Sequence, residues 1–150
     1  MLLNSKKRNV YLVDLGTGTD RNLLPLGIGF LSSYCNKFPD IREQFNIELR
    51  FLRTGTKEMV DSFDDPVLVG ISCYMWNFNA SMALARLVKQ RFPNCIIVGG
   101  AYSMPNITSR IEPFVKAHPY IDVMVHGEGE IVLSSLLMNI LAEKDFSTID

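Results

Sequence analysis

The sequence lacks the features that mark several large classes of protein. Its 150 residues carry fifteen basic and sixteen acidic side chains, a net charge of −1, so no excess of charge points to nucleic acid or to an anionic membrane. No apolar run approaches the roughly 20 residues of a membrane span, and the start MLLNSKKRN has too short an apolar run for a signal peptide. We therefore expect a cytoplasmic protein, with small molecules or proteins as partners.

Metal-binding patterns are also absent from the sequence. The three cysteines, Cys35, Cys73 and Cys95, lie far apart and form neither a CxxC pair nor a CxxxCxxC cluster motif, and the chain has only two histidines. We expect buried free thiols and no metal site in this chain.

The composition suits a single folding unit. With 47% hydrophobic and 10% aromatic residues, 150 residues can build one sizeable core. The sequence shows no internal repeat, low-complexity tract or linker.

Five short apolar segments predict a parallel sheet. Four are rich in β-branched residues without strict alternation, which is typical of strands covered by helices on both faces. The fifth alternates apolar and polar side chains, which suits an edge strand. The four buried segments are 10–15, 67–73, 95–99 and 121–125, and the edge segment is 47–53.

Helical periodicity fills most of the gaps between these strands. The expected helices are 26–38, one from Phe78 to Phe92, a segment within 105–117 that Pro113 interrupts, and a last helix through Val132, Leu136 and Ile140. Pro25 is placed like a first-turn proline, and Asn77 is a candidate cap. The alternation predicts a three-layer α/β fold, Rossmann-like (flavodoxin-like), with an open parallel five-stranded sheet of order 2-1-3-4-5.

Ligands of such sheets bind outside the carboxyl ends of the strands, near the switch between the first and third strands. This rule selects the loops 14–25, 74–77, 100–104 and 126–130 as the candidate site. The stretch GTGTD at 16–20 suggests phosphate, but Arg21 stands where a dinucleotide fingerprint needs glycine, and no Gly-Lys-Ser/Thr closes a P-loop. Thr17-Gly18-Thr19 partly matches a flavodoxin phosphate loop, so a flavin-binding electron carrier stays an alternative.

A phosphorelay receiver has the same expected sheet, but the chemistry differs. A receiver needs a phosphorylatable aspartate at the end of the third strand, where this chain has Ser72 and Cys73. We therefore exclude the receiver function.

Three motifs at the expected strand ends carry candidate binding residues. GISCYMW at 70–76 places a serine and two aromatic rings there, Gly99-Gly100 lets a bulky group approach the backbone, and HGEGE at 126–130 opens the last helix. Each has a structural alternative: the aromatic rings could cover an interface, the glycines could serve a turn, and the glutamates could complement the helix dipole.

Taken together, these residues resemble the N-terminal cobalamin (vitamin B12)-binding domain of cobalamin-dependent radical S-adenosylmethionine (SAM) enzymes. The matching pieces are PLGIGFLSSYC, VGISCYMWN, VKQRFPNCIIVGGAYS and DVMVHGEGE, and the similarity covers almost the whole chain. Related domains carry Asp-x-His-x-x-Gly, Ser-x-Leu and Gly-Gly motifs. Here Asp14 and Gly99-Gly100 match, Ser72-Cys73-Tyr74 stands for Ser-x-Leu, and Gly16 replaces the histidine that would bind cobalt.

The resemblance implies which residues meet the cofactor. Ser72 would contact the dimethylbenzimidazole tail, Gly99-Gly100 would let the tail lie along the fourth strand, and the loop from Gly16 would face the corrin ring. The full set of implied cofactor-binding residues is Asp14, Gly16, Thr17, Gly18, Thr19, Leu26, Gly27, Ser72, Tyr74, Trp76, Asn77, Gly99, Gly100, Ala101, Tyr102, Gly127, Glu128 and Gly129. No catalytic residue is expected, and cobalamin would bind base-off, with no histidine ligand.

The resemblance also implies a longer parent protein. Residues 1–150 would be its cobalamin-binding domain, and a downstream radical SAM domain would bind S-adenosylmethionine and a [4Fe-4S] cluster. The parent would perform methyl transfer, cyclisation or rearrangement on a biosynthetic substrate that this sequence does not identify. A flavodoxin-like carrier of FMN and an interaction domain without a ligand remain the alternatives.

Overall fold

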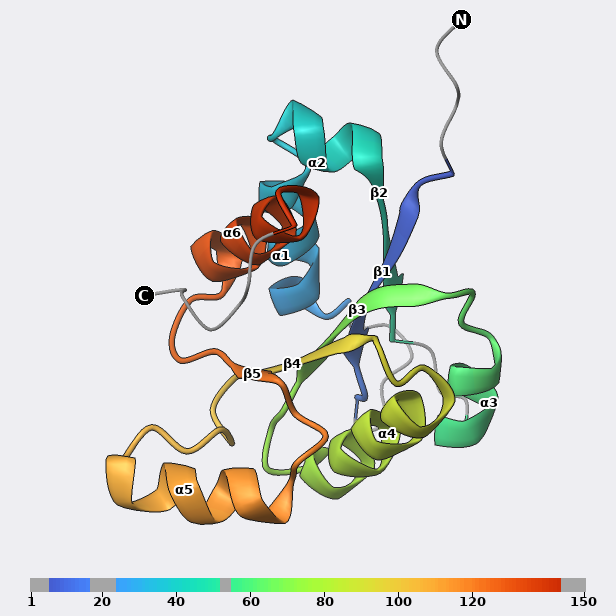
Figure 1. Ribbon diagram of the computed structural model, residues 1–150. Helices are drawn as coiled ribbons and strands as arrows, with labels where there is room; N and C mark the ends of the chain where they lie inside the picture. The colour runs from blue at the N-terminus through green and yellow to red at the C-terminus, as the bar shows by residue number, and fades with distance from the viewer. Residues whose placement is uncertain (1–5, 17–23, 52–54, 144–150) are drawn as a thin grey trace, which may run out of the picture.

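The chain folds around one parallel sheet. A computed structural model describes residues 6–16, 24–51 and 55–143, and its five strands lie in the order β2-β1-β3-β4-β5 (Figure 1). The strands are β1 (Arg8–Asp14), β2 (Phe45–Arg50), β3 (Pro66–Ser72), β4 (Ile96–Gly100) and β5 (Val123–Met124). The predicted fold class and strand order are confirmed.

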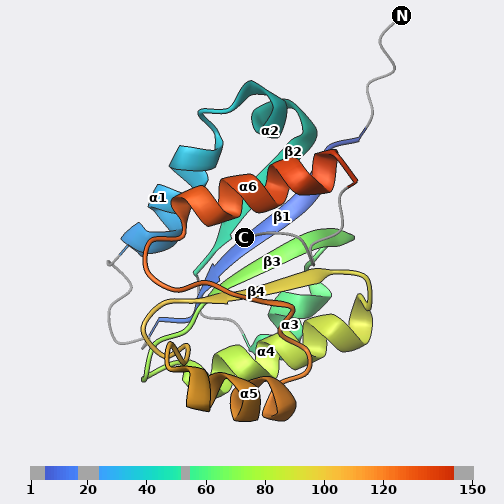
Figure 2. The same ribbon diagram turned by 60° about the vertical axis from the view of Figure 1, so that its left-hand side comes forward.

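Helices cover both faces of the sheet, so the molecule has three layers (Figures 1 and 2). One face carries α1 (Leu26–Cys35), α2 (Pro39–Gln44) and α6 (Glu130–Leu141). The other carries α3 (Thr56–Asp61), α4 (Phe78–Arg91) and α5 (Thr108–Ala117). In the described residues, no helix has the length and apolar character needed to cross a membrane.

Each face of the sheet has its own hydrophobic cluster, because successive strand residues point to opposite faces. Tyr11 and Val69 pack against α3 and α4, whereas Leu12 and Leu68 pack against α1 and α6. The register aligns Leu12 with Gly70 and Gly70 with Val98, and at the carboxyl edge Asp14 with Ser72 and Ser72 with Gly100.

The bounds of several predicted elements differ from those observed. The helix expected over 26–38 ends at Cys35, and α2 begins separately at Pro39, because proline has no N–H to continue the first helix. The strand expected over 121–125 is only two residues long, although Val125 N still donates to the Gly99 carbonyl at 2.8 Å.

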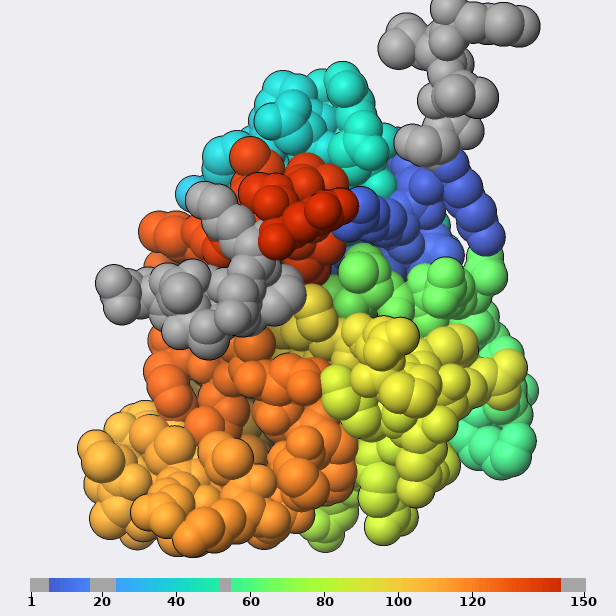
Figure 3. Space-filling model, in the orientation of Figure 1, coloured from blue at the N-terminus to red at the C-terminus, as the bar shows by residue number. Residues whose placement is uncertain are grey.

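Pro113 does not interrupt the helix that contains it. α5 runs through this residue. Pro113 has no N–H to donate to the Ser109 carbonyl, four residues earlier in the helix. Both residues are exposed, so water can bond to that carbonyl instead. α5 has no buried residue, and in the space-filling view it projects at one edge of the molecule (Figure 3).

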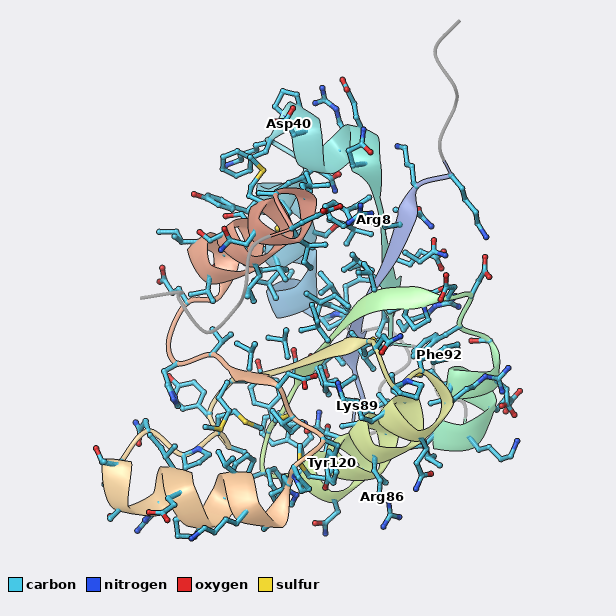
Figure 4. All side chains as sticks on the ribbon, viewed as in Figure 1. Arg8, Asp40, Arg86, Lys89, Phe92 and Tyr120 are labelled. Atoms are coloured by element: carbon cyan, nitrogen blue, oxygen red, sulfur yellow. The ribbon has the colours of Figure 1, made fainter. Side chains whose placement is uncertain are left out.

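An ion pair between Lys89 of α4 and Asp122, just before β5, holds this edge of the sheet against α4. Lys89 Nζ donates to the Cys95 carbonyl and to Asp122, each at 2.7 Å, and Asp122 Oδ2 accepts from Ile97 N at 2.7 Å. Lys89 and Tyr120 both lie at this junction (Figure 4). These contacts fix β4 and β5, whose following loops form part of the site described below.

Candidate functional site

A cavity of about 560 Å³ opens at the carboxyl edge of the sheet, on the face covered by α1 and α6. Residues of β1, β3 and β4 form its floor, helices α1 and α6 form its roof, and the loops after β3, β4 and β5 surround its mouth. We call this cavity the slot. It lies at the position that the sheet topology predicts for a ligand.

The floor of the slot has a glycine at its centre. Leu12, Gly70 and Val98 are register partners across three strands and all line the slot. A β-carbon added at Gly70 would lie 2.9 Å from Leu12 Cδ2, so Leu12 packs over Gly70 and a side chain there would push Leu12 toward the slot. Opposite the floor, Ile28 and Leu31 of α1 contribute to the roof, which keeps this end of the slot apolar.

Side chains added at the two adjacent glycines of β4 would point to opposite faces of the sheet. A β-carbon at Gly99 would lie 3.1 Å from Met104 Sδ, whereas one at Gly100 would meet only Val125 Cβ at 3.9 Å. Gly100 lines the slot and Gly99 does not. The absence of a side chain at Gly99 is therefore explained by the packing of Met104.

The loop after β3 is held by the buried amide of Asn77. Asn77 Oδ1 accepts from Tyr74 N at 2.8 Å, and Asn77 Nδ2 donates to the Ser72 carbonyl at 3.0 Å. Asn77 is the N-cap residue of α4, as predicted, but its side chain makes no capping hydrogen bond. Its amide instead fixes Ser72 and Tyr74, both of which line the slot.

Apolar side chains are exposed around the mouth of the slot. Trp76 stacks on Tyr74 with ring centroids 4.7 Å apart and is 60% exposed. Met75 is 85% exposed and Tyr102 is 96% exposed. Exposed apolar groups gathered at one edge are typical of a binding surface.

The loop after β5 owes its shape to two glycines. Gly127 has a φ of +76°, a conformation that favours glycine. A β-carbon at Gly129 would lie 3.1 Å from Leu31 Cδ2, so Gly129 lets this loop approach α1 closely. Glu128 and His126 also line the slot and bring ionisable groups to it.

Burial shifts the pKa of Asp14, Tyr74 and the three cysteines. Desolvation raises the pKa of Asp14, and desolvation followed by the charges of Asp14 and Tyr102 raises the pKa of Tyr74. Burial also raises the pKa of Cys35, Cys73 and Cys95 to about 12 each. The expectation of buried free thiols is confirmed, and thiols with such pKa values are poor nucleophiles near neutral pH.

The structure brings half of the predicted cofactor-binding residues into the lining of the slot. These nine are Gly27, Ser72, Tyr74, Gly100, Ala101, Tyr102, Gly127, Glu128 and Gly129. Six others lie outside the lining, namely Asp14, Gly16, Leu26, Trp76, Asn77 and Gly99. Thr17, Gly18 and Thr19 lie outside the described residues.

Sequence reasoning missed the apolar interior of the slot. Its lining includes Gly70, Val98, Ile28, Leu31 and Leu133, and none of these was predicted to bind the cofactor. The signal available was Gly70, because a glycine inside a strand often marks close approach of a ligand. Within the described residues, no group of three or more His, Cys, Asp or Glu side chains could hold a metal ion.

Two curated relatives match nearly the whole chain. It is 37% identical over 142 residues to the cobalamin-dependent radical SAM methyltransferase TokK of Streptomyces tokunonensis, and 39% identical over 137 residues to a 2-(S-pantetheinyl)-carbapenam-3-carboxylate methyltransferase of Streptantibioticus cattleyicolor. These matches cover 94% and 91% of this chain, but only 20% and 19% of the relatives. The chain therefore spans about a fifth of their length. No model of a known protein family matches the sequence.

Solved structures share the fold. The cobalamin-dependent S-adenosylmethionine radical enzyme OxsB, with aqua-cobalamin and S-adenosylmethionine bound, superposes with a TM-score of 0.69 at 24% identity, over 97% of this chain and 20% of its own. The isolated receiver domain of RcsB from Salmonella enterica superposes with a TM-score of 0.60 at 16% identity, over 94% of this chain and 93% of its own. At these identities the likeness shows the sheet and its helices, and the functional argument depends on the slot and on the sequence relatives.

Proposed function

We propose that this chain, which is related over nearly its whole length to part of a cobalamin-dependent radical SAM methyltransferase, is a cobalamin-binding module. The observation that carries the proposal is the slot, which combines a floor centred on Gly70 with an apolar roof at the carboxyl edge of the sheet. Its volume of about 560 Å³ lies in the range of small-molecule sites.

The residues present fit the two parts of cobalamin differently. The slot is too small for a whole corrinoid but suits its nucleotide tail, with Ser72 and Gly100 at the entrance. The corrin ring would then lie over the carboxyl edge, where Met75, Trp76 and Tyr102 expose apolar surface. The amide groups of the corrin would find hydrogen-bond partners in the polar groups of the surrounding loops.

In this function the chain binds and orients, and cobalamin supplies cobalt-centred alkyl-transfer chemistry when it is bound. Asn77 holds Ser72 and Tyr74 in place through its two amide hydrogen bonds. Gly129 lets the loop after β5 close against Leu31. The chain itself is proposed to contribute no catalytic residue.

We further propose that cobalamin binds base-off without a histidine ligand. Gly16 stands where related domains carry the histidine, and His118 lies before β5, at the opposite edge of the sheet, where its Nδ1 is 2.7 Å from Tyr120 Oη. The Co(II) form should show an electron paramagnetic resonance spectrum without nitrogen superhyperfine splitting. Because His126 lines the slot, nitrogen splitting that disappears in His126→Ala would contradict this assignment.

The greater length of the relatives supports a second part of the proposal. The module would serve a radical SAM domain that binds S-adenosylmethionine and a [4Fe-4S] cluster, in a methyltransferase or related enzyme. A downstream CxxxCxxC motif in the intact protein would support this, and a natural stop codon after Asp150 would contradict it.

Equilibrium dialysis against cobalamin and against FMN tests the binding function directly. Retained corrinoid absorbance is the expected result. Retained flavin in place of corrinoid would favour the electron carrier, and a folded protein that retains neither would favour an interaction domain.

A further inference from the structure

We propose that the slot selects the base at the end of the corrinoid's nucleotide tail, accepting a benzimidazole and rejecting a purine, and that Gly70 sets the depth available to that base. This inference rests on the proposed cobalamin-binding function and adds a specificity to it. It concerns the interior of the slot, whereas the proposed function concerns the slot and its mouth together.

The interior of the slot is lined by hydrocarbon side chains. Leu12 and Val98 flank Gly70 on the floor, and Ile28 and Leu133 face them from the helices. All four side chains are buried and apolar. A base held there would meet hydrocarbon above and below its plane.

The polar side chains of the slot are unevenly distributed. The polar side chains that line the slot are those of Ser72, Tyr74, Tyr102, Asn106, His126, Glu128 and Glu130. They come from the carboxyl end of β3, from the loops after β3, β4 and β5, and from the first residue of α6. The mid-strand floor offers only backbone groups, which are already used in the ladders with the neighbouring strands.

Burying a polar atom without a hydrogen-bond partner costs free energy. A dimethylbenzimidazole presents methyl groups and ring C–H groups at its far edge, so it loses little on entering hydrocarbon. Adenine presents an amino group and ring nitrogens, which would be buried without partners at a cost of free energy. We expect an adenine-based cobamide to bind at least about tenfold more weakly than cobalamin.

Gly70 makes this selection possible because, having no side chain, it lets Leu12 lie low against the floor. A β-carbon there would lie 2.9 Å from Leu12 Cδ2 and 4.0 Å from Leu68 Cδ2. Both atoms are at the ends of flexible side chains, so Gly70→Ala should keep the fold while its methyl group and a displaced Leu12 fill part of the slot. The base could then enter the slot less deeply, and the contacts of the corrin ring outside the slot would not change.

The test measures three corrinoids against the same protein by equilibrium dialysis, with corrinoid absorbance as the readout. The probes are hydroxocobalamin, an adenine-based cobamide, and cobinamide, which lacks the nucleotide tail. We expect cobalamin to bind most tightly and the other two at least about tenfold more weakly. Gly70→Ala should remove most of the advantage of cobalamin and leave cobinamide binding unchanged.

Two further variants keep the test decisive. Gly55→Ala is the matched control, since nothing lies within 4 Å of a β-carbon at Gly55, and all three affinities should stay the same. Val98→Ile adds one methylene to the floor from β4, so it should also weaken cobalamin binding and leave cobinamide binding unchanged. It therefore replaces Gly70→Ala as the test if Gly70→Ala fails to fold.

The outcomes separate this inference from the proposed function. Equal binding of cobalamin and cobinamide would show that the slot does not take the base, and equal binding of the two cobamides would show that it does not select; either result overturns the inference and leaves corrinoid binding intact. If none of the three corrinoids binds the folded protein, the proposed function itself is wrong.

Discussion

The two faces of the sheet differ at the adjacent glycines of β4, because a neighbouring side chain fills the space beside one of them and not beside the other. On the α3/α4 face, Met104 Sδ lies 3.1 Å from the position of a β-carbon at Gly99. On the α1/α6 face, the nearest atom to the same position at Gly100 is Val125 Cβ at 3.9 Å, and Gly100 lines the slot. One glycine permits close packing and its neighbour keeps space open, so the same residue type serves stability on one face and binding on the other.

The largest effect is expected from bulk on the open face. Gly100→Val would place a branched side chain in the slot, so we expect cobalamin affinity to fall on the order of a hundredfold. Thermal melting should show little change, because the added atoms enter the slot and not the packed core. Cobalamin titration of the folded variant measures the effect, and affinity equal to that of the parent would show that the tail does not pass Gly100.

The matched change on the packed face should affect stability instead. Gly99→Val would crowd Met104 and Ile121, with a β-carbon 3.1 Å from Met104 Sδ and 3.7 Å from Ile121 Cγ2. We expect the free energy of unfolding to fall by up to about 3 kcal/mol. Urea unfolding measures this loss. Unchanged stability together with lost cobalamin binding would reverse the roles that we assign to the two glycines.

Asn77 links the two faces, because it begins α4 on one side while its amide holds residues of the slot on the other. Asn77→Ala would remove its hydrogen bonds to Tyr74 N and the Ser72 carbonyl, and Asn77 is only 4% exposed. We expect a loss of about 1–2 kcal/mol in stability. Cobalamin affinity should fall as well, and a stability loss with unchanged affinity would show that the loop does not need this support for binding.

The smallest effect is expected on stability, from the carboxylate charge of Asp14 at the carboxyl edge of the sheet. Desolvation raises the pKa of Asp14 above its ordinary value of 3.8, so the ionised carboxylate destabilises the folded state at neutral pH. This cost is absent below the ordinary pKa and grows as the pH rises toward the raised value. Asp14→Asn should therefore be more stable than the parent at neutral pH and equally stable in acid.

Urea midpoints of both proteins at neutral pH and below 3.8 check the Asp14 prediction. A variant that is less stable than the parent at neutral pH would mean that the carboxylate has favourable partners. The same variant should keep its cobalamin affinity within a few-fold if the tail and the slot carry most of the binding.

Sequence reasoning predicted the architecture because strand and helix periodicities are strong local signals. The sheet order and the meeting of the loops after β3, β4 and β5 at one edge are confirmed. The face of the sheet to which each strand residue points could not be predicted, since an error of one position in the strand moves its side chains to the other face. Gly99 and Gly100 were therefore treated as one unit, although they serve different faces.

The slot itself required the three-dimensional structure. Its floor joins Leu12, Gly70 and Val98, which are separated by many residues and meet only through the register of three strands. The break between α1 and α2 at Pro39 also went unpredicted, because apolar residues continue through Phe38. Long-range register and local breaks of this kind leave little signal in a single sequence.

Methyl NMR of the leucine and valine side chains tests the central claim most directly, because it reports on both faces at once. On addition of diamagnetic Co(III) cobalamin, the ring current of a base in the slot should shift the methyl signals of Leu12, Val98 and Leu133, which line it. The signals of Val69 and Val88, in the cluster on the opposite face, should stay in place. Shifts confined to the opposite face, or bound cobalamin with no shift in the slot, would contradict the account.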